Sequence, residues 1–161
     1  MSVNREIELK GTIRSEHLDR IRNLSAIKQR TVGRARSRKF VTVYFDTPDH
    51  ELLRRQIRRV GVEHLQPVFR TDFQRSSRTL KFDDDSTAST DIDVGEIVAG
   101  HASEPIGEFE LELETGAPER IFELASEIGK AAPFRLTTLS KASRGYALLT
   151  QDHPRPQKYV T

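Results

Sequence analysis

Strict alternation of hydrophobic and acidic side chains between residues 106 and 114 constrains the fold of this chain more than any other feature. The hydrophobic positions are Phe109, Leu111 and Leu113, and the acidic ones are Glu108, Glu110, Glu112 and Glu114. A period of two places the two sets on opposite faces of a β-strand, because successive side chains of a strand point to opposite sides. The segment therefore predicts a strand that is buried on one face and carries carboxylates on the other.

The N-terminal segment 3–10 shows the same alternation, with Glu6, Glu8 and Lys10 on one face. Carboxylates two residues apart on a strand lie about 7 Å from each other and repel. A solvated strand face is the ordinary explanation for such a row. The alternative is a bound Mg²⁺ or Mn²⁺ ion, since these cations take oxygen ligands and bridge to phosphates.

Two helices are expected elsewhere in the chain. Ser15 precedes hydrophobic residues at helical spacing, which predicts an N-cap and a helix near 15–28. Pro118 is a favourable first-turn residue for a second helix, which we expect to end at Gly129. Both helices are amphipathic and therefore require a surface to cover.

The remaining segments predict short strands. They are expected at 40–45, 68–73, 79–82 and 92–98, with a basic connection over 29–39 and no clear period over 49–66. This content indicates an α+β fold built on an antiparallel sheet. We expect a single domain over 1–150 and a flexible tail over 151–161.

The charges of the chain are distributed unequally. Residues 1–81 contain 19 Lys or Arg and 9 Asp or Glu, whereas residues 82–161 contain 7 and 15. Two explanations fit this asymmetry: an acidic segment folded onto a basic body, or one site that holds anion-binding and cation-binding groups together.

Several classes of protein are excluded by what the sequence lacks. There is no cysteine, which excludes disulfides, thiolate metal sites and a cysteine nucleophile. The hydrophobic runs are far shorter than the roughly 20 residues that cross a bilayer. The first residues show no secretory pattern, so we expect a cytoplasmic protein with no membrane association. Neither a P-loop nor a dinucleotide-binding motif occurs, and the scattered histidines do not support a histidine metal site.

Six segments resemble, in the same order, motifs of the CYTH superfamily, the triphosphate tunnel metalloenzymes. They are Glu6 to Lys10 for E-x-E-x-K, Tyr44 to Asp49 for the Y-F-D-T-P hairpin, Pro67 to Arg75 for the P-V-F strand of the bacterial inorganic triphosphatase branch, Asp93 to Ile97 for D-x-G-E-I, Glu108 to Glu112 for the later E-x-E-x-E strand, and Ser140 to Leu148 for the S-K-A-x-R-G-Y-A-L end. The E-x-E-x-K motif alone is weak, but six ordered matches are specific.

The resemblance implies an antiparallel β-barrel of eight strands, forming a tunnel that binds a triphosphate with Mg²⁺ or Mn²⁺. It assigns metal binding to Glu6, Glu8, Asp93, Glu108 and Glu110, phosphate binding to Lys10, Arg58, Arg75, Lys141 and Arg144, and catalysis to Glu6, Glu8 and Lys10. Glu112 and Glu114 are expected to face solvent or the rim.

The segment between the hairpin and the P-V-F strand is shorter than the family pattern. The family places an L-R-x-R strand, a T-x-K strand, an R-x-E strand and a helix there, whereas this chain has only the residues between Asp49 and Pro67. Arg58 is interpreted as a remnant of L-R-x-R. A barrel that lacks strands must close smaller, stay open, or take strands from a second chain. We therefore expect a barrel that is incomplete or has fewer than eight strands, and either a homodimer or a smaller closed barrel.

These features lead us to expect a metal-dependent hydrolase of inorganic triphosphate or a related triphosphorylated compound. A class IV-type adenylate cyclase or a thiamine triphosphatase is an alternative within the same family. A non-catalytic polyphosphate- or nucleotide-binding module is an alternative of another class. An RNA-binding domain that uses the Arg-rich first half is less favoured, because no aromatic-rich strand for base stacking is evident.

Overall fold

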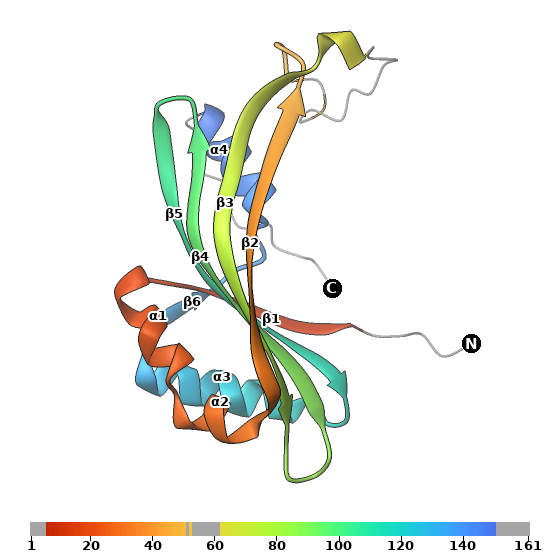
Figure 1. The fold of residues 1–161 in the computed structure, drawn as a ribbon, viewed down its shortest axis with the longest axis vertical. Coiled ribbons are helices and arrows are strands. Elements are labelled where there is room, and N and C mark those ends of the chain that lie inside the picture. The colour runs from red at the N-terminus through yellow and green to blue at the C-terminus, as the bar shows by residue number, and fades with distance from the viewer. Residues whose placement is uncertain (1–5, 51, 53–61, 151–161) are drawn as a thin grey trace, which may run out of the picture. The chain divides into compact units, whose positions relative to one another are not determined.

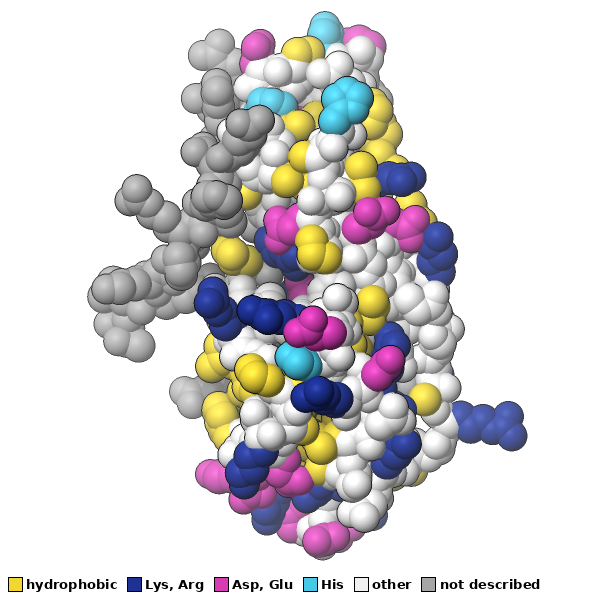
Figure 2. Space-filling model, turned by 90° about the vertical axis from the view of Figure 1, so that its left-hand side faces the viewer, with side chains coloured by type: hydrophobic (Ala, Val, Ile, Leu, Met, Phe, Trp, Pro, Cys, Tyr) yellow, Lys and Arg dark blue, Asp and Glu magenta, His cyan; other side chains and the backbone are white. Residues whose placement is uncertain are grey.

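The computed structural model describes residues 6–50, 52 and 62–150 (Figure 1). The chain divides into two compact units. The first comprises Met1–Arg38, Gln74–Val94 and Ile106–Thr137, and the second comprises Lys39–Phe73, Gly95–Pro105 and Thr138–Thr161. Within the described ranges no helix is long and apolar enough to cross a membrane. Charged side chains of both signs are mixed with hydrophobic ones on the face shown in Figure 2.

One antiparallel sheet of six strands forms the framework, in the spatial order β2-β3-β4-β5-β1-β6. Its strands are β1 (Ile7–Ile13), β2 (Thr31–Asp46), β3 (Gln66–Lys81), β4 (Thr87–Ala99), β5 (Ala102–Thr115) and β6 (Phe134–Leu136). Strands β2 and β6 lie at the two edges, so the described sheet is open. The expected α+β class and the incomplete barrel of fewer than eight strands are confirmed.

Three helices cover one face of the sheet in the first unit. They are α1 (Ser15–Arg22), α2 (Ser25–Arg30) and α3 (Glu119–Ala131). The core between helices and sheet is almost entirely aliphatic and aromatic, with fully buried Ile21, Ile27, Phe109, Leu111 and Leu124. Burial of such side chains contributes roughly 1.5–3 kcal/mol each. The hydrophobic face of β5 predicted from the sequence is this core face.

The second unit is held by an aromatic cluster and a partly buried ion pair. The Phe69 ring stacks on Tyr44 at 4.3 Å between centroids and meets Tyr146 of α4 (Lys141–Thr150) edge-on at 4.9 Å. Arg144 of α4 donates to Glu104 at 2.7 Å and to the Pro105 carbonyl at 2.7 Å. These contacts fix α4 to β3 and β5.

The segment near 15–28, which was predicted as one helix, forms the two helices α1 and α2. Asn23 ends α1, where its side-chain amide donates to the Asp19 carbonyl, and Leu24 takes an extended conformation before α2 begins. An asparagine that bonds to the backbone competes with helix continuation. The N-cap of α1 is Arg14 rather than Ser15, which is the first helical residue.

The strand predictions at 40–45, 68–73, 79–82 and 92–98 were too short. The 29–39 segment was expected to be a connection, but β2 begins at Thr31, and β4 begins at Thr87. The strands predicted at 68–73 and 79–82 belong to one strand, β3, which runs through the intervening polar residues and ends at Lys81. Exposed charged side chains in β2 and partly buried polar ones in β3 hid the alternation. Helix α3 passes Gly129 and ends at Ala131, because Ala132 precedes a proline and is extended.

The approach of β1 to β5 depends on Gly107. A Cβ atom at this position would collide with the carbonyl oxygen of Ile13. The absence of a side chain therefore lets β1 and β5 lie close together near Glu108, which is paired with Thr12 in the register.

Candidate metal and phosphate site

The sheet of the first unit has one apolar face and one charged face. In the β1–β5 register Leu9 is paired with Leu111 on the core side, and Lys10 is paired with Glu110 on the other side. The alternation seen in both segments therefore produces one surface of charged side chains from adjacent strands.

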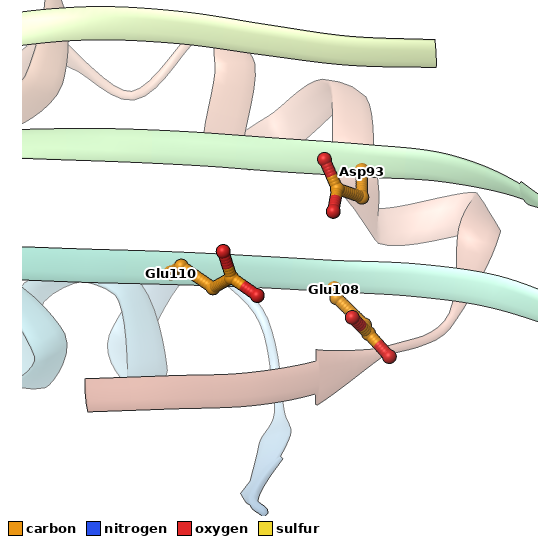
Figure 3. Close-up of side chains that lie close together, drawn as sticks. All are labelled: Asp93, Glu108 and Glu110. Carbon is orange, nitrogen blue, oxygen red and sulfur yellow. The ribbon is translucent and has the colours of Figure 1, made fainter. Parts of the chain in front are cut away.

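Three carboxylates meet on this charged face. Asp93 projects from β4, and Glu108 and Glu110 project from β5 (Figure 3). One oxygen of each carboxylate lies within 4.8 Å of one oxygen of each of the others. Asp93 and Glu108 are buried, with 1% and 0% of their surfaces exposed. Buried carboxylates require compensating charge or hydrogen bonds, because removing them from water is costly.

Lys10 provides part of this compensation. Its ammonium lies 3.0 Å from Glu108 and 3.1 Å from Glu110. The lysine side chain is 13% exposed, so these contacts are shielded from solvent and stronger than a surface ion pair.

Arg75 of β3 provides a second cation. Its guanidinium donates to both oxygens of Asp93 at 2.7 Å and to Glu110 at 3.0 Å, and it pairs with Asp91 at 2.8 Å. The bidentate bond to Asp93 is the main reason that the pKa of Arg75 is raised above its ordinary value. Arg75 is thus a permanent cation that orients three carboxylates.

Glu8 lies next to this group on β1, opposite Glu112 in the register. The pKa of Glu8 is raised, first by partial burial and then by the negative charge of Glu110. Glu6 precedes β1 and is exposed. Among the described residues, the carboxylates around Lys10 and Arg75 outnumber these two cations, so this part of the charged face carries excess negative charge.

The donor set fits a hard divalent cation. All donors are carboxylate oxygens, the ligand type that Mg²⁺ and Mn²⁺ prefer. Two oxygens bound to one Mg²⁺ ion at about 2.1 Å are at most about 4.2 Å apart, so the observed 4.8 Å limit requires only small side-chain rotations. Asp93, Glu108 and Glu110 can therefore hold such an ion while sharing oxygens with Lys10 and Arg75.

The other predicted residues have different surroundings. Lys141 and Arg144 belong to α4 in the second unit, where the Lys141 ammonium lies 4.8 Å from the centre of the Phe73 ring. Arg144 is buried and bonded to Glu104. Arg58 lies outside the described residues. Glu112 and Glu114 are exposed, as expected.

Sequence reasoning missed Asp91. It lies two residues before Asp93 on β4 and pairs with Arg75. The same period of two that identified the glutamates on β5 could have found it, since residues 91 and 93 must share a face.

Comparison with known proteins identifies the family of this chain. Residues 55–146 match the CYTH domain, so the chain belongs to the CYTH domain family. The chain is 36% identical over 84 residues to an inorganic triphosphatase of Haemophilus influenzae. The matched segment covers 52% of this chain and 24% of that protein, so the chain spans about a quarter of the length of this relative.

The chain is also similar to a solved structure of a Hippeastrum protein, which is described as an adenylyl cyclase candidate with a dominant triphosphatase activity. The aligned region covers 93% of this chain and 98% of the Hippeastrum chain. The identity is 14% and the TM-score 0.49, and the family assignment does not rest on it. The CYTH match contains Arg75, Asp93, Glu108 and Glu110, whereas Lys10 lies before it.

Proposed function

We propose that this protein hydrolyses inorganic triphosphate or a related triphosphorylated compound with the help of Mg²⁺ or Mn²⁺. The observation that carries the proposal is the group of buried Asp93, buried Glu108 and half-buried Glu110, which is held by Lys10 and Arg75 on the charged face of a CYTH sheet. Similarity to an inorganic triphosphatase supports the substrate class.

The residues of the charged face have separate roles in this proposal. Asp93, Glu108 and Glu110 hold the divalent ion, which when bound neutralises phosphate charge and polarises the phosphorus. Lys10 lies beside them and binds a phosphate oxygen. Arg75 fixes the carboxylates and excludes alternative arrangements of their oxygens.

Glu8 is proposed as the group that accepts a proton from the attacking water. The pKa of Glu8 is raised toward neutral pH, which makes its carboxylate a better proton acceptor than an ordinary one. Glu6 lies on the same side of the strand and is proposed to support the metal-binding role. Lys141, Arg144 and Arg58 remain proposed phosphate ligands.

A non-catalytic binder of polyphosphates or nucleotides is the second candidate, because the described sheet is open and the segment between Asp49 and Pro67 is shorter than the family pattern. Phosphate release from triphosphate, ATP and thiamine triphosphate separates the candidates, with cyclic AMP formation from ATP measured in parallel. Release from triphosphate with Mg²⁺ or Mn²⁺ supports the hydrolase. Thermal stabilisation by triphosphate without any turnover supports the binder.

A further inference from the structure

Strand β2 carries a row of three arginines that the proposed function does not use. Arg34, Arg36 and Arg38 alternate along the strand and all three are exposed. Alternate residues of a strand share a face and lie about 7 Å apart. We refer to these residues as the arginine row.

The arginine row lies on the same face of the sheet as the carboxylate group. The Gln74 side-chain amide of β3 donates to the Ser37 hydroxyl of β2 at 2.7 Å, so these two residues share one face. Their neighbours Arg36, Arg38 and Arg75 must then share the opposite face. Since Arg75 binds Asp93 and Glu110, this opposite face is the charged one.

The three arginines differ from the other cations of this face in having no acidic partner. Lys10 and Arg75 each contact two or more carboxylates. Among the described residues, none forms an ion pair with Arg34, Arg36 or Arg38. Three neighbouring guanidinium groups repel one another, and an anion bound along the row would relieve this repulsion.

The length of the row indicates the size of the anion. From Arg34 to Arg38 the strand extends about 13 Å, which exceeds the span of a triphosphate. An anion that also reaches Asp93 and Glu110 must cross β3 and then follow β2. A flexible linear chain of phosphates has this shape and offers negative charge at every unit.

We infer that Arg34, Arg36 and Arg38 bind the distal phosphates of a linear inorganic polyphosphate whose end lies at the carboxylate group. The inference rests on the proposed function, because it places the reacting end at the proposed metal site. The inferred substrate is longer than triphosphate, and the arginine row of β2 determines which chain length is preferred.

Single-stranded RNA is the competing polyanion. RNA-binding strands generally present aromatic rings on which bases stack. The rings that follow on the same side of β2 already stack within the protein, Phe40 on Phe73 at 5.4 Å and Tyr44 on Phe69 at 4.3 Å. Residues 31–39 contain no aromatic side chain, so the arginine row itself offers charge without rings for base stacking, which favours polyphosphate.

The test is calorimetric binding of triphosphate, long-chain inorganic polyphosphate and a single-stranded RNA oligonucleotide in metal-free buffer, where turnover is absent. We compare the wild type with R34Q/R36Q/R38Q and R34K/R36K/R38K. The matched control is R20Q/K28Q/K130Q, which removes the same charge from exposed positions of α1, α2 and α3.

We expect the long chain to bind the wild type at least about tenfold more tightly than triphosphate, the sum expected for three exposed charge contacts. The glutamine triple variant should lose most of this preference for the long chain over triphosphate. The lysine variant should keep most of the preference, and the control should keep all of it. The affinity for the long chain should also fall more steeply with salt concentration than the affinity for triphosphate.

A wild-type ratio near one, an equal loss in the control, or tighter binding of RNA than of polyphosphate would overturn the inference. Phosphate release from triphosphate is measured separately on the same protein preparations after addition of Mn²⁺. Absence of turnover with the ratio intact would reject the proposed hydrolase and leave the inference standing. Turnover with an unchanged ratio in the glutamine variant would reject the inference alone.

Discussion

Lys10 of β1 and Glu110 of β5 are directly paired across adjacent strands, and the lysine ammonium lies 3.1 Å from the glutamate carboxylate. The same ammonium reaches the fully buried Glu108. One cation thus bridges two carboxylates that would otherwise repel each other. This relationship links the stability of the sheet to the chemistry of its charged face.

Removing Lys10 should therefore destabilise the protein. In Lys10→Ala the buried Glu108 loses its ammonium partner, and breaking such a pair costs about 3 kcal/mol. Urea unfolding measures the loss. The double variant Lys10→Met with Glu108→Gln should regain most of it, because no charge is then left without compensation. Equal stability of Lys10→Ala and wild type would contradict the importance of this contact.

Divalent cations should stabilise the wild type by relieving the excess negative charge. At a hundredfold excess over Kd, Mn²⁺ should raise the Tm by about 5 °C or more. Glu110→Gln should abolish most of this rise. Glu114→Gln is the matched control, because Glu114 belongs to the same strand but is exposed and lies outside the carboxylate group. The same rise in both variants would show that the ion binds elsewhere.

Glu8 should cause a distinctive pH dependence in the metal-free protein. Its pKa is raised above the ordinary value of 4.5 by partial burial and by Glu110. The native state therefore binds the proton more tightly than the unfolded state, and stability falls as pH rises from about 4.5 through the raised pKa. Glu8→Gln should have a higher Tm than wild type at pH 7.

This difference should shrink as pH falls, since wild-type Glu8 then becomes neutral as well. Thermal melts from pH 4 to pH 8 in the presence of a chelator follow it. A lower Tm of Glu8→Gln at neutral pH would show that the Glu8 carboxylate is stabilising and that its pKa is not raised.

Within the described residues β2 lies at an edge of the sheet, and this edge predicts self-association. Val41, Val43 and Phe45 alternate on this edge strand and are exposed by 54%, 45% and 49%. Unpaired strand edges with hydrophobic side chains recruit other chains. We expect a homodimer in light scattering at micromolar concentration and a monomer for Val43→Lys. A wild-type monomer across the whole concentration range would contradict this prediction.

The sequence was most informative where hydrophobic and charged residues alternate. Such alternation predicted β1 and β5, their buried faces and the carboxylates at Glu108 and Glu110, because the period of two leaves no other regular structure. The grouping of Asp93 with these glutamates came from the family resemblance. It requires strand order, which a local pattern does not contain.

The sequence was least informative along β2 and β3. The residues of β2 before Phe40 are exposed on both faces, so charged and small side chains occupy them and no hydrophobic alternation marks the strand. The partners of Arg75 were likewise invisible, since Asp93 and Glu110 are distant in sequence. Only the register of the sheet brings them within hydrogen-bonding distance.

The initial rate of phosphate release from triphosphate as a function of Mn²⁺ concentration tests the account most directly. We expect no release in the presence of a chelator, a rate in the wild type that saturates with Mn²⁺, and a loss of at least about tenfold in Glu110→Gln, as expected when a metal site is impaired. Wild-type release that is independent of divalent cations, or equal rates in wild type and Glu110→Gln, would contradict it.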